Sequence, residues 1–263
     1  MGTISAIAKI ENYAPADLDR EAGQRWVTMS NAMNRASHGL TLVEKRILMS
    51  AIAQLDSARN PRPGECPVVQ IKAADYAATF GLDPNISYEQ LQTGAKHLYE
   101  RSITFFESAY NRKGVPLLKG KVITMRWVGQ ADYKKNEGCI ELHFWHAVVP
   151  HLMGLKKAFT SYQLQQASAL RSVYSWRLLE LLMRFKVTGW AEYEIDDFCM
   201  SMGATEKQKE NFAAIRRKII EPAVAELIAK DGWLIEWSAI KTGRKVTAVR
   251  FDFKRNQQGP LSF

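Results

Sequence analysis

The predicted order of secondary-structure elements repeats along this chain, and the repetition restricts the possible folds more than any single motif. In the second half, apolar spacing predicts a helix ending near Phe185, and alternation over residues 190–195 predicts a strand. A short helix over residues 196–202, which Gly203 would stop, leads through a polar turn to a long helix from Asn211. A hairpin of two strands follows, over residues 233–237 and 245–253.

The first half has the same order. Thr41 and Glu44 have the spacing of a capping box, which predicts a helix start at this point. Gly81 would stop a short helix over residues 72–80, and we expect Ser87 to cap the next helix. The remaining predicted elements are a strand over residues 68–71, a helix over 87–102, strands over 121–129 and 139–145 with a turn over 132–138 between them, and a short helix over 147–155.

Each half thus contains a helix, a strand, a short helix, a turn, a longer helix and a β-hairpin. This is the order of a helix-turn-helix followed by a β-wing, so we predict an α+β chain of two tandem winged-helix domains. The predicted division lies after residue 157, with residues 1–157 (an arm over 1–25) in the first domain and residues 158–263 in the second. One α+β domain whose elements happen to alternate is the alternative, and the sequence leaves it open.

The charge favours an anionic partner for both halves. The net charge is +9 and the pI is about 9.4. Residues 1–160 hold 20 Lys and Arg against 15 Asp and Glu, and residues 161–263 hold 16 against 12. A single basic tail would concentrate the excess in one place, whereas two DNA-contacting modules would share it.

The helix from Asn211 is the best candidate for reading DNA. At about 100° per residue, its apolar residues point into a core, and Arg217 points away from them. Ala213 and Ala214 flank Arg217, and their small side chains would let the backbone approach a groove floor. A guanidinium can bond two guanine acceptors at once in the major groove. The expected contacts of this helix are Ala213, Ala214, Arg216, Arg217 and Lys218, with Arg216 and Lys218 reaching phosphates; a solvated basic face is the alternative.

Two further segments complete the predicted DNA-binding set. The hairpin of the second half is basic, which suits contact with phosphates or the minor groove; an edge strand protected by lysines is the alternative. The helix over residues 87–102 is less basic, because Glu89 and Glu100 lie on it, so we expect weaker base reading or an interface role there. The predicted contacts are Lys241, Arg244, Lys245 and Arg250 in the hairpin, and Thr93, Lys96 and His97 in the first-half helix.

No catalytic or cofactor-binding pattern is found in the sequence. His143 and His146 are three apart in a predicted strand and would point to opposite faces, so no metal site and no nicking chemistry are expected. Residues 114–121 resemble a phosphate-binding loop only loosely, since the glycines are too far apart and Val122 stands where Ser or Thr is needed. Three scattered cysteines indicate a reducing cytoplasm. Neither a signal peptide nor a membrane-spanning stretch is present, so we expect no membrane association.

Four segments resemble one known family, the iteron-binding plasmid replication initiators of the F-plasmid type. The similarity covers roughly residues 26–255 and is carried by the order of the four segments more than by any one of them. One departure is Leu179, where the family often has tyrosine. The segments are LTLVEKRIL at residues 40–48, SVYSWRLLELL at 172–182, RRKIIEPAVAEL at 216–227, and GRKV at 243–246 with VRFDF at 249–253.

The resemblance implies two winged-helix domains related by a pseudo-two-fold axis, which bind successive major grooves of directly repeated origin DNA. It implies monomers that open the origin and dimers that repress the protein's own promoter, the first domain supplying the dimer interface. It further implies the host initiator DnaA, the replicative helicase and chaperones as partners, near plasmid DNA in a bacterial cytoplasm. A two-domain winged-helix repressor without initiation activity is the alternative.

Overall fold

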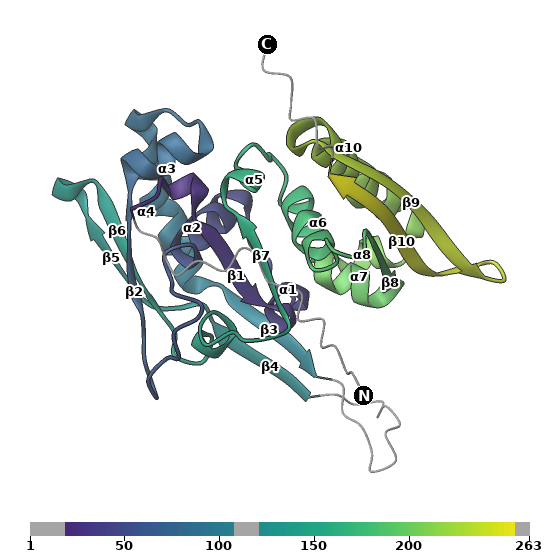
Figure 1. Ribbon diagram of the computed structural model, residues 1–263, viewed down its shortest axis with the longest axis horizontal. Coiled ribbons are helices and arrows are strands. Elements are labelled where there is room, and N and C mark those ends of the chain that lie inside the picture. The colour runs from purple at the N-terminus through teal and green to yellow at the C-terminus, as the bar shows by residue number, and fades with distance from the viewer. Residues whose placement is uncertain (1–18, 108–120, 256–263) are drawn as a thin grey trace, which may run out of the picture.

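The computed structural model describes residues 19–107 and 121–255 and places two winged helices side by side (Figure 1). The first lies within residues 42–144 and the second within residues 173–255. The first fifteen elements are η1 (Ala22–Gln24), β1 (Trp26–Ser30), α1 (Asn31–Arg35), α2 (Leu42–Ile52), β2 (Val68–Lys72), α3 (Ala73–Phe80), α4 (Pro84–Glu100), β3 (Ser102–Glu107), β4 (Lys121–Arg126), β5 (Val128–Lys134), η2 (Lys135–Glu137), β6 (Cys139–Phe144), η3 (Val149–His151), β7 (Phe159–Gln163) and α5 (Gln165–Ser168).

The remaining elements build the second winged helix. They are α6 (Val173–Met183), β8 (Trp190–Glu194), α7 (Ile195–Met202), α8 (Glu206–Lys209), α9 (Phe212–Ile215), η4 (Arg216–Ile220), α10 (Glu221–Asp231), β9 (Trp233–Thr242) and β10 (Lys245–Arg255). The β9–β10 hairpin is the wing, and in Figure 1 it extends well beyond the helices. None of the helices in the described ranges is long and apolar enough to cross a membrane.

The two winged helices share one topology. Their three-stranded sheets have the orders β2-β6-β5 and β8-β10-β9, so in each the first strand pairs with the last. In each, an eight-residue helix follows the first strand directly and ends at a left-handed glycine, Gly81 or Gly203. The amide after each glycine bonds five residues back, Leu82 to Ala77 and Ala204 to Cys199. The predicted tandem winged-helix fold is therefore confirmed.

Long-range pairing ties the beginning of the described chain to its middle. β1 pairs antiparallel with β7, with Trp26 opposite Gln163. Residues 159–163 were not predicted as a strand, because pairing with a segment so distant in the sequence leaves no local signal. The predicted division after residue 157 stays a prediction.

Several predicted boundaries were wrong. Helix α4 begins at Pro84 rather than Ser87, because Asp83 accepts the bond from the Asn85 amide and proline suits the first helical turn. Ser87 is buried within the helix. Residues 132–134 belong to β5, not to a turn; the polar side chains that suggested a turn lie on the outer face of the sheet. The helix over residues 147–155 is reduced to the turn η3, which contains Pro150.

One further prediction was wrong, one was confirmed, and some segments lie outside the residues that the structure describes. The polar turn before the long helix contains a short helix, α8, with its own capping box between Thr205 and Gln208. The capping box between Thr41 and Glu44 is present as predicted. The arm up to residue 18, the loop over 114–120 and the tail over 256–263 lie outside the described residues.

Candidate nucleic-acid interface

The second winged helix presents a helix-turn-helix whose second part we call the recognition helix, residues 212–231, formed by α9, η4 and α10. Asn211 caps it, because its Oδ1 accepts a bond of 2.9 Å from the Ala213 amide. Ile215 and Ile219 are buried and fix the helix to the core. The Phe212 ring lies 6.4 Å from the Trp237 ring of β9, so the helix also packs on the base of the wing.

The recognition helix contains a widened turn just before Pro222. Residues Arg216–Ile220 form a π-helical turn, in which the Glu221 amide bonds to the Arg216 carbonyl. α-Helical hydrogen bonding resumes in α10, which has Pro222 in its first turn. Turns of this kind recur at functional sites, and this one contains the three cations predicted to contact DNA.

The cations of the π-turn differ in their partners. Arg216 Nε lies 2.8 Å from Glu221 Oε1, so this guanidinium is already paired. Arg217 and Lys218 are exposed, and within the described residues neither has a hydrogen-bond or ion-pair partner. Ala213 is exposed and Ala214 partly so, as expected for positions that would face a groove. Arg217 and Lys218 are therefore the cations on this helix best placed for an anionic ligand.

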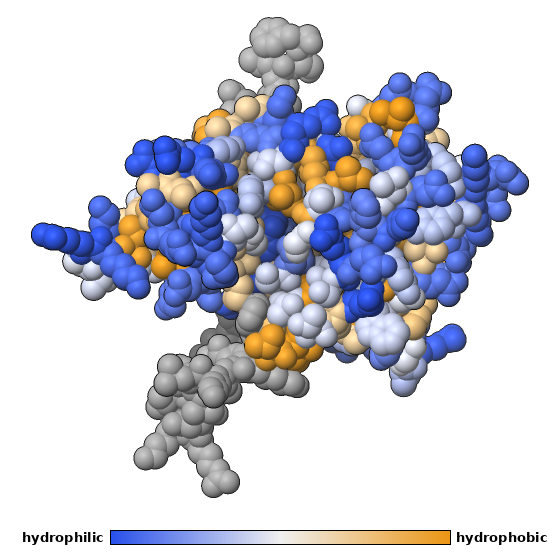
Figure 2. All heavy atoms as spheres, turned by 180° about the vertical axis from the view of Figure 1, so that it is seen from behind, coloured by the Kyte–Doolittle hydropathy of each residue, from blue (hydrophilic) through white to orange (hydrophobic). Residues whose placement is uncertain are grey.

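The wing brings three more predicted residues to one tip. Lys241, Arg244 and Lys245 are exposed around the β9–β10 turn, where Gly243 adopts a φ of +63° that favours glycine. In Figure 2, seen from behind, the projecting wing ends in hydrophilic side chains. The tip is thus a basic projection at the end of the hairpin that follows the recognition helix.

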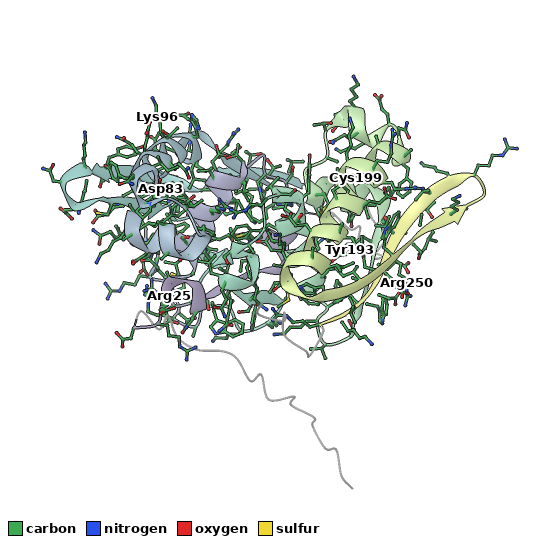
Figure 3. All side chains as sticks on the ribbon, turned by 90° about the horizontal axis from the view of Figure 1, so that it is seen from above. Arg25, Asp83, Lys96, Tyr193, Cys199 and Arg250 are labelled. Atoms are coloured by element: carbon green, nitrogen blue, oxygen red, sulfur yellow. The ribbon has the colours of Figure 1, made fainter. Side chains whose placement is uncertain are left out.

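Arg250 is not part of this group. Its neighbours Val249 and Phe251 are buried toward the helices, so Arg250 lies on the outer face of the sheet. Its guanidinium pairs with Asp252 at 2.9 Å and lies 4.7 Å from the Trp190 ring centre. In Figure 3, Lys96 and Arg250 point toward opposite sides of the molecule.

The equivalent helix of the first winged helix, α4, holds Thr93, Lys96 and His97. All three are exposed, and their spacing of three and four puts them on one face. Gly94, on the inner side, packs so closely on α2 that an added Cβ would lie 2.5 Å from Ile47 Cδ1. Thr93 and His97 border a groove between α2 and α4 of about 530 Å³.

Some charged residues near these surfaces were missed in the sequence analysis. Lys207 and Lys209 are exposed on α8, just before the recognition helix, and Lys209 pairs with Glu206 at 2.7 Å. Lys135 is exposed at the tip of the β5–β6 hairpin, which corresponds to the wing in the first winged helix. The adjacent lysines of the segment DYKKNEG could have indicated this second basic tip, once the segment is placed in a hairpin.

His143 has carboxylate neighbours that its sequence spacing does not reveal. Strand pairing of β5 with β6 brings Asp132, Glu141 and His143 together, and one ligand atom from each lies within 4.8 Å of the others. Asp132 is 3.2 Å from His143 Nε2, and Glu141 is 2.6 Å from Lys134 Nζ. His146 is not part of this group, and its ring contacts the Trp145 ring in a tilted arrangement with the centroids 4.3 Å apart. The carboxylates thus have protein partners already.

Comparison with known proteins agrees with the arrangement of two winged helices in tandem. A family model described as "Initiator Replication protein, WH1" matches residues 26–183, and one described as "Initiator Rep protein, WH2" matches residues 194–253. An Escherichia coli protein described as "Uncharacterized 27.6 kDa protein" is 25% identical over 234 residues, covering 85% of this chain and 93% of that protein. The "PI protein" of Escherichia coli is 25% identical over 251 residues, covering 85% and 80%.

A solved structure shares the fold over most of the chain. The crystal structure of the Pi initiator protein in complex with iteron DNA superposes with a TM-score of 0.68 at 21% identity, covering 89% of this chain and 99% of that one. The two family models together span both winged helices. The resemblance seen in the sequence is confirmed: the chain belongs to the initiator replication protein family, with its WH1 and WH2 domains in tandem.

Proposed function

We propose that this initiator binds directly repeated duplex DNA of a plasmid origin, the iterons, with the recognition helix in one major groove and α4 in the next. The observation that carries the proposal is the pair of exposed cations Arg217 and Lys218, which have no partner among residues 19–107 and 121–255. The tip of the wing that follows this helix adds three more exposed cations. Arg217 would read a guanine, while Lys218 and the wing tip would contact phosphates. Thr93, Lys96 and His97 would make the weaker contacts of the first winged helix.

The tandem arrangement of the two winged helices would allow the protein to bend and open origin DNA by binding alone, without a covalent step. Two winged helices in one chain can hold neighbouring grooves of a direct repeat from one side. Bending 20–30 base pairs by 40–90° costs on the order of 1–6 kcal/mol, and this strain would favour opening of adjacent A·T-rich DNA. Binding energy, rather than a covalent step, would then drive initiation.

The remaining family properties belong to the same proposal. Monomers would open the origin, and dimers joined through the first domain would repress the protein's own promoter. Host DnaA, the replicative helicase and chaperones would be the protein partners, and the protein would act in the bacterial cytoplasm, where plasmid DNA lies. A winged-helix repressor that does not initiate replication would have the same surfaces, so the test must include replication.

The test combines footprinting with replication. The full chain is mixed with a supercoiled plasmid that carries its gene and the neighbouring repeats, without ATP, and the same plasmid is introduced into a suitable host. We expect protection and bending of a direct repeat, autonomous replication, and both strands intact. An Arg217→Ala chain should protect and bend the repeat more weakly and replicate less well, again with both strands intact. Protection without replication would support the repressor alternative. A metal-dependent strand break abolished by a point mutation in this chain would contradict the proposal.

A further inference from the structure

The recognition helix changes its hydrogen-bond pattern at the point where its cations lie. Upstream, α9 begins at the Asn211 cap, and downstream, α10 is α-helical from Glu221. Between them, the Glu221 amide reaches the Arg216 carbonyl, five residues back instead of four. The helix therefore contains one π-turn, and its cause should be found in the residues around it.

Pro222 accounts for the π-turn. In an α-helix the amide of residue 222 would bond the carbonyl of Lys218, but proline has no amide hydrogen and its ring collides with the carbonyl four residues back. Widening the preceding turn moves that carbonyl away from the ring. The buried residues on both sides, Ile215 and Ala223, are 1% and 0% exposed, so neither end of the helix is free to swing instead.

The geometry of the π-turn determines which of its cationic side chains are exposed on the same side of the helix. It holds more residues than an α-turn, so three consecutive side chains spread over a narrower arc, and Arg216, Arg217 and Lys218 are all exposed. The Arg216–Glu221 pair is a second consequence, because residues three or four apart are neighbours on an α-helix and residues five apart are not. That pair occupies Arg216 and leaves Arg217 and Lys218 as the available cations.

We propose that Pro222 is a specificity-determining residue of the DNA interface: it acts as a positioning residue, without touching DNA, by holding the π-turn that presents Arg217 and Lys218 together. This inference rests on the proposed binding of repeated duplex DNA. An α-helical turn in its place has a larger angular step per residue, about 100°, so the directions of Arg217 and Lys218 relative to the buried Ile215 would change. Arg217 would then no longer point at the same base pair.

The experiment compares Pro222→Ala with a matched control in the full chain. Alanine restores the missing amide and is the best helix former, so it permits an α-helical turn. Ala225→Gly, at an exposed position one turn further along α10, weakens the helix without touching the π-turn. Each chain is titrated with a duplex carrying the repeat and with a shuffled duplex of equal composition, and its thermal unfolding is recorded.

We expect Pro222→Ala to lower the ratio of specific to non-specific affinity about tenfold or more, as loss of a base contact would. Its affinity for shuffled DNA should stay within about twofold, and Ala225→Gly should keep the wild-type ratio. Amide hydrogen exchange gives a structural readout, since the new amide of residue 222 should be protected by the Lys218 carbonyl. An unchanged ratio in Pro222→Ala, or equal losses on both duplexes, would overturn the inference while leaving the proposed function intact.

A double variant separates positioning from general damage. In the wild-type background, Arg217→Ala should cost roughly fivefold or more on the repeat. In the Pro222→Ala background it should cost almost nothing further, because Arg217 is no longer at its base pair. A full additional loss would show that Arg217 still reads its base and would refute the role of Pro222. A wild-type chain with no preference for any repeated duplex would contradict both the inference and the proposed function.

Discussion

The Nζ atom of Lys45 lies 2.7 Å from Oε2 of Glu180, and each side chain is only 1% exposed. Lys45 belongs to α2 and Glu180 to α6, the opening helices of the two winged helices. The other carboxylate oxygen of Glu180 accepts a bond of 2.8 Å from the Tyr162 hydroxyl. Burial lowers the pKa of Lys45 to about 8, with the Glu180 carboxylate opposing that shift. The two winged helices are thus joined through a buried, hydrogen-bonded ion pair.

The first prediction concerns this pair. Glu180→Gln removes the charge that compensates Lys45 and should lower the free energy of unfolding by about 3–5 kcal/mol, measured by urea titration at pH 7. The double variant Lys45→Met with Glu180→Leu should lose less, because no unpaired charge stays buried. Asp197→Asn is the control: it breaks the exposed Arg35–Asp197 pair and should cost at most about 1 kcal/mol. Equal losses for Glu180→Gln and Asp197→Asn would contradict the prediction.

The second prediction concerns the acid side of the stability profile. Burial lowers the pKa of His38 well below its ordinary value, and the nearby charges of Arg177 and Lys45 lower it further. Below about pH 6.5 the His38 side chain is protonated in the unfolded chain but stays neutral in the folded chain, so the proton favours unfolding. This contribution to stability is therefore full above that pH and is lost as the pH falls below it.

Urea unfolding between pH 7.5 and 5 tests this dependence. The wild-type chain should lose stability over that range, and a His38→Gln chain should lose less of its own starting value. His146→Gln, at an exposed histidine, should follow the wild-type slope. A His38→Gln slope as steep as that of the wild type would show that other groups cause the acid sensitivity.

Local signals in the sequence predicted local structure well. The capping box of Thr41 and Glu44 and the stop at Gly203 are both determined by neighbouring residues, and both are present. The pairing of β1 with β7 could not be predicted, because it depends on residues far apart in the chain. The burial of Lys45 and Glu180 could not be predicted either. Charged residues on a helix are normally assigned to its solvent-exposed face, and only the packing of a second helix reverses that assignment.

The candidate site likewise has features that the sequence predicts and features that depend on the rest of the fold. The exposure of Arg217 follows from helical spacing, so it was predictable. The π-turn was not, because a proline within a helix disrupts the hydrogen bonding around it but does not show how the backbone will adjust. The outer-face position of Arg250 depends on which side of the sheet the helices cover, and a count of basic residues along the hairpin cannot give that side.

The third prediction is that Arg217 supplies sequence discrimination. Arg217→Ala should lose about 1–3 kcal/mol of binding free energy on the specific duplex and less on shuffled DNA. Lys230→Ala, an exposed cation at the far end of α10, should leave the ratio of the two affinities unchanged. Competition titrations at one fixed salt concentration measure that ratio, and equal ratios for the wild-type and Arg217→Ala chains would contradict the prediction.

The last prediction separates two arginines of one hairpin. Arg244 lies at the exposed wing tip, whereas Arg250 lies on the outer face of the sheet, paired with Asp252 and stacked on Trp190. If the tip contacts phosphates, Arg244→Gln should weaken binding to all duplexes alike and make the slope of log K against log salt shallower by about one unit. Arg250→Gln removes the same charge from the same hairpin and should leave that slope unchanged, because its guanidinium is engaged away from the recognition helix. A shallower slope for Arg250→Gln as well would show that DNA reaches the outer face of the sheet.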